Sequence, residues 1–384
     1  MNSLLFSVSM MCLAVLLLIF LLKKLRQPYI IAYILVGILF GPHVGRIFTN
    51  TNDIASLGEI GLLLLMFFLG METDIPDQRS LLVKPLVAQG MKMLLGITFA
   101  TLVGTMFGWS VYSIVVLAIL FIFNSTAVVS EYLSKNGERH SSFGKLLLNI
   151  LLLQDVLLVP VLTVFQFMDK QGLSPLKVLT AMIASGVIVL LLRAVRHRNF
   201  IKPEFLIELA NDHELQVFLG GSIVLGFGLV AELAGLNGAV GSFVAGVLIG
   251  RTHSFHWLEH SLKPFRIFFI SFFFMSIGIR LDLNYLAMNY KLILTGTLLV
   301  LLSNSLLTAM VFRSLRYNWK ESFYGGALLS QTGEFGIIAC TLAYKMDIID
   351  SRFFKAGLAI TALTLLFSTT WITVLRKLMD VSPK

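Results

Sequence analysis

The amino-acid sequence predicts an all-α polytopic membrane protein, and three observations lead to this fold class. Hydrophobic residues make up 57% of the 384 residues and charged residues only 13%, with a mean hydropathy of +0.86. Apolar stretches of roughly 20 residues, the length that a helix needs to cross a bilayer, recur from Leu4 to Val374. Lys and Arg gather in the short stretches between them. This pattern excludes a soluble domain, and it places the net charge of +9 in membrane loops rather than on a nucleic-acid-binding surface.

The expected transmembrane helices follow the apolar stretches along the chain. About 13 are expected, at residues 4–22, 28–46, 57–71, 81–107, 111–133, 143–168, 174–192, 214–233, 236–250, 265–280, 290–312, 321–344 and 354–375. If loops alternate between the two sides of the membrane, those after odd-numbered helices, counted with the helix ends that flank them, hold 21 Lys and Arg, and those after even-numbered helices hold 8. Because positive loops stay in the cytoplasm, the N-terminus is predicted outside and the C-terminus inside.

Two distant parts of the chain resemble each other at a nearly constant offset of about 208 residues. The matching stretches are "GILFGPHVG" (37–45) with "GVLIGRTHS" (246–254), "MFFLGMETD" (66–74) with "FMSIGIRLD" (274–282), and "FNST" (123–126) with "SQTG" (330–333). Each pair lies seven helices apart, and because seven is odd, the two halves cross the membrane in opposite senses. Such an inverted-topology repeat, here about 28–168 and 236–375 within one membrane domain (1–384), is typical of secondary transporters. Chance matches among glycine and aliphatic residues are the alternative.

A carboxylate stands near the centre of the sixth expected helix: Asp155, in "LLNILLLQDVLLVPVL". A charged side chain at the bilayer centre costs at least about 2.5 to 3.5 kcal/mol, so it needs a partner or a function. Asp155 can hold a proton or a cation but hardly both. Such competition produces obligatory exchange if the protein changes conformation only when a proton or a cation occupies this site. Gln154, beside Asp155, adds a polar ligand. The alternative is an Asp155 that is paired inside the bundle and only fixes helix packing.

Polar residues interrupt two expected helices at positions that the repeat relates. The interruptions are Asn124, Ser125 and Thr126 in the fifth helix, and Gln331, Thr332, Gly333 and Glu334 in the twelfth. Unwound backbone is tolerated in a membrane where it is buried in protein or lines a cavity. We therefore predict two crossed discontinuous helices beside Asp155, whose free carbonyls, with the Asn124 and Thr126 oxygens, replace the hydration shell of a monovalent cation. Alternatively, the hydroxyls bond to their own helix and Asn124 only joins helices.

Two further features are interpreted as structural. Lys92 lies within the fourth helix, where we expect it to snorkel to the interface or to pair with an acid. In "RTHSFHWLEHSLKPFR", His253, His256 and His260 would share one helix face, which allows a pH sensor or a metal site. The preferred interpretation is an amphipathic linker helix that lies in the cytoplasmic interface, so no metal site is predicted.

With these residues identified, the chain is similar over nearly its whole length to Kef-type potassium/proton antiporters of the monovalent cation:proton antiporter superfamily. The strongest stretches are "QPYIIAYILVGILFGPHVG", "LGEIGLLLLMFFLGMETD", "LLLQDVLLVPVL", "AELAGLNGAVGSFVAGVLIG", "LKPFRIFFISFFFMSIGIRLDL" and "SQTGEFG". The resemblance implies a homodimer in which a dimerisation domain frames a mobile core that carries the ion by an elevator-like motion. It also implies that Gln154 and Asp155 are the family's Gln-Asp pair on the ion-carrying helix, and that 124–126 and 331–333 are its crossed, broken helices.

The sequence departs from the family's pattern in two places. Many relatives carry a Lys or Arg in the middle of the eleventh helix, paired with the carrier acid, whereas here Ser303, Asn304 and Ser305 occupy the middle. Asn304 is the candidate partner that remains, and the family's salt-bridge switch is in doubt. Kef-type systems also usually continue into a cytosolic nucleotide-binding domain that gates transport. This chain stops within about ten residues of its last expected helix, so that domain is expected to be missing or on a separate subunit.

Together, the central carboxylate and the resemblance predict electroneutral, one-to-one exchange of K⁺ for H⁺ through competition at Asp155, in the lipid of a bacterial inner membrane. Both ions are substrates, and no cofactor is expected in this chain. Gln154 cannot carry a proton, although titration of Glu334 would change the stoichiometry. Sodium/proton antiport and a ligand-gated K⁺ efflux pore are the alternatives, and a divalent ion such as iron(II) ranks last. An enzyme is not expected, because HExxH and paired-aspartate GxGD motifs are absent from the sequence.

Overall fold

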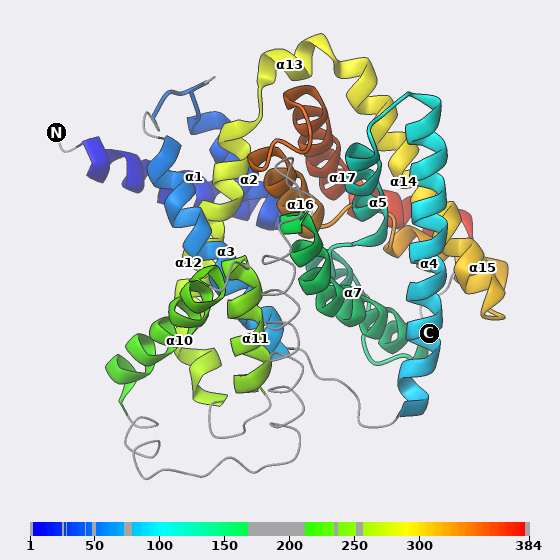
Figure 1. Cartoon of the computed structure of the whole chain (residues 1–384), viewed down its shortest axis with the longest axis horizontal. Coiled ribbons are helices and arrows are strands. Elements are labelled where there is room, and N and C mark those ends of the chain that lie inside the picture. Colours follow the sequence, from blue (N-terminus) through cyan, green and yellow to red (C-terminus); the bar gives the residue numbers. More distant parts are fainter. Residues whose placement is uncertain are drawn as a thin grey trace. The chain divides into compact units, whose positions relative to one another are not determined.

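The computed structural model describes residues 3–24, 27, 29–42, 44–47, 51–72, 79–167, 212–233, 237–250 and 256–380. Every secondary-structure element in these ranges is a helix (Figure 1), which confirms the predicted all-α class. Seven of the described helices are long and apolar enough to cross a membrane, and four further apolar helices are shorter. The span expected at 174–192 lies outside the described residues, so the total of about 13 stays a prediction.

The chain forms two compact units, each of which draws on both predicted repeats. The first consists of 1–47, 76–158 and 278–384, and the second of 48–75 and 159–277. The helices of the first unit are α1 (Ser3–Lys24), α2 (Tyr29–Phe40), α4 (Arg79–Met106), α5 (Val111–Ile122), α6 (Thr126–Lys135), most of α7 (Ser142–Phe167), α13 (Leu283–Met288), α14 (Tyr290–Ser314), α15 (Trp319–Leu328), α16 (Glu334–Lys345) and α17 (Ser351–Leu378). Those of the second are α3 (Thr51–Glu72), α10 (His213–Leu233), α11 (Gly238–Gly250) and most of α12 (His256–Arg280).

The described helices follow the expected spans, with two corrections. Helix α2 ends at Phe40, whereas the sequence predicted a span to residue 46. The linker helix predicted before residue 265 is not a separate interfacial element, because it is continuous with the next span as α12. Leu258 and Leu262 in its first turns are fully buried against α3 and α10, and this burial holds the segment in the helix despite Pro264. His253 and the side chain of His256 lie outside the described residues, so the predicted histidine face stays a prediction.

The second unit depends on backbone contact between α3 and α11. A Cβ atom on Gly246 would overlap the carbonyl oxygen of Phe67, and one on Gly70 would overlap that of Phe243. Only glycine permits this approach, and Gly246 and Gly250 are spaced four residues apart, as in helix pairs that pack closely in membranes. Gly70 and Gly246, which lie in the matched stretches of the sequence, are therefore needed for helix packing.

The core of the first unit forms where α6, α7, α14, α15 and α17 meet. Its fully buried side chains include Leu133, Leu147, Phe312, Leu328 and Ile372, one from each of these helices. Apolar side chains can pack this way only if the half-length helices α6 and α15 lie against the full-length ones. This packing fixes α6 and α15 against α7, the helix that carries Asp155.

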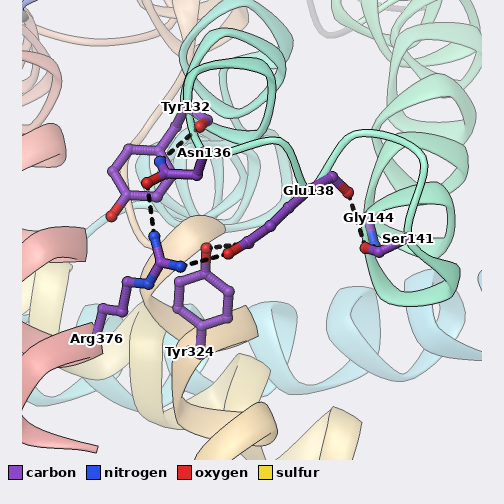
Figure 2. Close-up of polar contacts among 7 residues, drawn as sticks. All are labelled: Tyr132, Asn136, Glu138, Ser141, Gly144, Tyr324 and Arg376. Carbon is purple, nitrogen blue, oxygen red and sulfur yellow. Dashed lines mark hydrogen bonds and ion pairs between the residues drawn. The ribbon is translucent and has the colours of Figure 1, made fainter. Parts of the chain in front are cut away.

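A buried polar cluster joins the α6–α7 loop to α15 and α17 (Figure 2). Arg376 Nη2 lies 2.5 Å from Glu138 Oε1, and Arg376 Nη1 donates to Asn136 Oδ1 at 2.7 Å. The Tyr324 hydroxyl donates to the other carboxylate oxygen of Glu138 at 2.6 Å. Only 7% of Glu138 is exposed, so this carboxylate depends on its two donors for solvation.

We predict that Arg376→Met lowers the free energy of unfolding by about 3 to 5 kcal/mol, because it leaves the Glu138 carboxylate buried without its cation. Tyr324→Phe should cost about 1.5 to 3 kcal/mol, the range for a hydrogen bond to a charged group. Unfolding of the purified protein in mixed micelles by denaturing detergent measures both values. In the double variant Glu138→Gln/Arg376→Met the free energy of unfolding should fall by less than in Arg376→Met alone. An equal or larger fall would contradict the conclusion that the Glu138 carboxylate depends on Arg376.

Candidate ion-binding site

The first helix break lies where the sequence predicted it, at residues 123–125. Helix α5 ends at Ile122, and Phe123 follows in an extended conformation (φ −99°, ψ 128°). Helix α6 begins at Thr126, and its N-cap is Ser125, whose hydroxyl oxygen accepts the backbone N–H of Val128 at 3.3 Å. Serine is favoured at this position because its side chain satisfies an N–H that has no partner within the helix. Ser125 therefore starts a new helix in the middle of an apolar span.

The second break spans residues 329–333 and contacts the first directly. Helix α15 ends at Leu328, and α16 begins at Glu334 after the extended Gly333. The backbone N–H of Gly333 donates to the carbonyl oxygen of Phe123 at 3.2 Å. A Cβ atom on Gly333 would lie 2.5 Å from the carbonyl carbon of Asn124, so only glycine allows the two backbones to approach this closely. The predicted meeting of two broken helices is confirmed.

Asn124 joins the two breaks through both ends of its side-chain amide. Its Nδ2 donates to the carbonyl oxygens of Leu329 at 3.0 Å and Gln331 at 2.7 Å. Its Oδ1 accepts from Gln154 Nε2 at 3.3 Å and from Lys92 Nζ, and its backbone N–H donates to Gln154 Oε1 at 2.8 Å. Asn124 and Gln154 thus connect α7 to both breaks. Their predicted role as direct cation ligands stays a prediction.

The other predicted residues of the second break that the structure describes are buried among polar side chains. Asn304 on α14 donates to the carbonyl oxygen of Ser330 at 3.1 Å, so it supports this break. The hydroxyls of Thr332 and Thr364 are 2.8 Å apart. Gln331 is fully buried, and within the described part of the chain neither polar atom of its side chain has a hydrogen-bond partner. Glu334 begins α16, but its side chain lies outside the described residues.

Asp155 lies beside the start of α6. Its side chain is buried, with 3% exposed, and the hydroxyl of Thr126 lies 3.1 Å from Oδ1 and 3.3 Å from Oδ2. Thr126 is the first residue of α6, so the carboxylate is close to the positive end of that helix's dipole, which favours a negative charge there. The structure therefore brings Asp155 to the first break, as predicted.

Sequence reasoning was wrong about Lys92 and missed Gln89, both on α4. Lys92 does not snorkel, because only 3% of it is exposed, and it donates to neutral oxygens: Asn124 Oδ1, and the carbonyl oxygen of Leu329 at 3.4 Å. Gln89 Oε1 accepts from Gln154 Nε2 at 3.0 Å. The available signal was their spacing, since residues three apart share one face of a helix. That face of α4 is directed at the joined breaks.

Two discontinuous helices joined at their breaks beside a buried carboxylate define a cation-coupled secondary transporter. The chain belongs to the sodium/hydrogen exchanger family, whose transmembrane profile matches residues 11–377. It is therefore a cation/proton antiporter of the membrane and not an enzyme, in agreement with the prediction from the sequence.

Several characterised proteins are similar to this chain. The iron transporter MagA of Paramagnetospirillum magneticum is 27% identical, over 94% of this chain and 83% of its own length. A glutathione-regulated potassium-efflux system protein of Haemophilus influenzae is 27% identical, over 94% of this chain and 59% of its own length. K⁺ efflux antiporter 5 of Arabidopsis thaliana is 27% identical, over 89% of this chain and 61% of its own length. The chain thus spans about three fifths of these two potassium-efflux relatives, and the resemblance to Kef-type antiporters is confirmed.

The fold is also similar to a solved structure. The sodium proton antiporter of Methanocaldococcus jannaschii superposes with a TM-score of 0.68, and the match covers 99% of both chains at 15% sequence identity. At this identity the match establishes the fold alone.

Gly333→Ala should abolish at least nine tenths of cation-dependent proton flux in proteoliposomes, because the added methyl group overlaps the backbone of the first break. Gly336→Ala is the matched control on the same helix. There the new Cβ atom meets only the flexible end of Leu120, at 2.7 Å, so flux should stay within about twofold of wild type. Equal flux from the two variants would show that the close contact between the breaks is not needed.

Proposed function

We propose that this protein exchanges K⁺ for H⁺, one for one, through alternating occupation of Asp155. The observation that carries the proposal is the placement of this buried carboxylate at the joint of two broken helices, in contact with Thr126. The potassium-efflux names of two relatives support K⁺ as the cation. Because the carboxylate accepts a proton or a cation, each ion can load the core only after the other has left.

The charge of the loaded site supports electroneutral exchange. A proton or a K⁺ ion each adds one positive charge to Asp155, and the neighbouring Gln154 cannot change its charge. The core therefore carries the same charge in both directions, and the membrane potential does not drive the cycle. The Thr126 hydroxyl and the side-chain oxygen of Gln331, which has no hydrogen-bond partner within the described part of the chain, are the neutral ligands proposed to complete the shell of a dehydrated monovalent ion.

Sodium/proton exchange is the second candidate, and membership of the sodium/hydrogen exchanger family favours it. The distinction rests on the field strength of the ligands. A site with one carboxylate and otherwise neutral oxygens favours the ion that loses its water more easily, which is K⁺. Iron, which the name of another relative indicates, is a divalent ion that would need more negative charge than Asp155 supplies.

The proposed setting is a homodimer in a bacterial inner membrane, with the N-terminus outside and the C-terminus in the cytoplasm. The excess of Lys and Arg in loops after odd-numbered helices supports this orientation. An elevator-like motion of the core, the inverted repeats at 28–168 and 236–375, and control by a nucleotide-binding domain on another chain belong to the same proposal.

Asp155→Asn should abolish K⁺-driven proton flux in proteoliposomes that contain a pH dye, because the amide cannot take up and release a proton and has no negative charge to offset a cation. Wild-type flux should need no charge-compensating ionophore and should exceed that driven by equal Na⁺ or Li⁺ gradients. Asp282→Asn, which removes an acid that pairs with Lys355 instead, should retain the flux and serves as the control. Transport by Asp155→Asn, or K⁺ movement without protons, would replace the exchange mechanism with a pore.

Thr126→Val should raise the half-saturating K⁺ concentration about 3- to 10-fold, since it removes one hydroxyl ligand worth about 1 kcal/mol and keeps the volume of the side chain. Thr126→Ser restores the hydroxyl and should restore the affinity. K⁺ titrations of the proton flux measure both variants. An unchanged half-saturating concentration in Thr126→Val would exclude Thr126 from the ion's shell.

A further inference from the structure

We propose that Lys92 determines the specificity of the site: its ammonium group is a resident positive charge that selects monovalent over divalent cations. This inference rests on the proposed function, because it concerns the ion that Asp155 binds. Lys92 is absent from the residues that either the sequence pattern or the family resemblance assigned to the site.

The first step is the position of the ammonium group at the joint of the two breaks. Lys92 Nζ donates to Asn124 in the first break and to the carbonyl oxygen of Leu329 in the second. Leu329 is the C-cap of α15, so its carbonyl belongs to the negative end of that helix's dipole. Carbonyl oxygens of this kind attract cations. In this chain the cation that they hold is part of the protein.

The second step is the proximity of Lys92 to the carrier carboxylate. Asn124, which accepts from Lys92, and Thr126, which contacts Asp155, are two residues apart in one break. Their Cα atoms are therefore separated by at most about 8 Å, because consecutive Cα atoms are 3.8 Å apart. Lys92 and Asp155 are each only 3% exposed, so dissolved salt screens the interaction between their charges weakly.

The third step concerns how this charge acts on different ions. The repulsion between Lys92 and a bound ion is proportional to the charge of the ion. If the lysine charge weakens K⁺ binding by a factor f, it weakens the binding of a divalent ion in the same place by f². For charges about 10 Å apart in a protein interior, f is on the order of ten and f² on the order of a hundred. A single fixed lysine thus weakens the binding of a divalent ion about tenfold more than that of K⁺.

The test compares K⁺ with Mn²⁺ in proteoliposomes. Lys92→Gln removes the charge and keeps an N–H donor for Asn124, whereas Lys92→Arg keeps the charge. The half-saturating K⁺ concentration and the concentration of Mn²⁺ that halves K⁺-driven proton flux are measured for each. In Lys92→Gln the half-saturating K⁺ concentration should fall about tenfold, and the Mn²⁺ concentration that halves the flux should fall by about the square of that factor. In Lys92→Arg the ratio of the two values should match wild type.

A second variant makes the test independent of replacing the lysine. Gln89 lies three residues before Lys92 on α4; its Oε1 accepts from Gln154, and its buried Nε2 has no hydrogen-bond partner among the described residues. Gln89→Glu keeps the acceptor and replaces the unpartnered nitrogen with a carboxylate oxygen, which offsets the lysine charge. Its half-saturating K⁺ concentration and its inhibitory Mn²⁺ concentration should therefore both fall, as in Lys92→Gln. The factor for Mn²⁺ should again be about the square of the factor for K⁺.

The possible results separate this inference from the proposed function. Equal shifts for K⁺ and Mn²⁺, or no shift in either variant, would overturn the specificity role and leave Lys92 as a structural joint between the breaks. Wild-type inhibition by Mn²⁺ at concentrations that equal the K⁺ requirement would overturn it as well. Continued exchange in Asp155→Asn would instead refute the proposed function, whatever the Lys92 variants show.

Discussion

The backbone polar groups of two interrupted helices must find partners without water, and the rest of the site depends on this constraint. The N–H of Gly333 bonds to the carbonyl of Phe123, and the amide of Asn124 bonds to the carbonyls of Leu329 and Gln331. Each bond connects one break to the other. Neither interrupted helix can therefore shift along its axis alone without exposing unpaired groups, and the two move or stay together.

Two residues of opposite charge type contact the first break. Asp155 contacts Thr126 at the start of α6, whereas Lys92 contacts the Asn124 amide and the end of α15. In the proposed exchange the carboxylate takes up and releases ions while the ammonium group stays in place. On the specificity role proposed for Lys92, its charge repels every ion that enters, and selectivity then depends on a residue that does not touch the ion.

The sequence was sufficient for features that depend on residue type and spacing. Asn124 to Thr126 and Gln331 to Gly333 interrupt apolar spans visibly, and the offset between the repeats predicted that the breaks meet. The partners of Lys92 could not be predicted in this way. One of them is the backbone carbonyl of Leu329, which any residue at that position would supply, so no sequence pattern marks it. The continuity of α12 depends on the burial of Leu258 and Leu262 by other helices, and a local pattern does not contain this information.

The contacts of Lys92 also bear on how the chain is made. Leu329 follows Lys92 by 237 residues, which a ribosome takes roughly 12 to 50 s to synthesise at about 5 to 20 residues per second. Asn124 arrives after only 32 residues. Helix α4 must therefore enter the membrane with a lysine near its centre, at a cost of about 2.5 to 3.5 kcal/mol, before α15 exists. Until that helix is inserted, Lys92 lacks one of the two oxygen acceptors that it has in the finished protein.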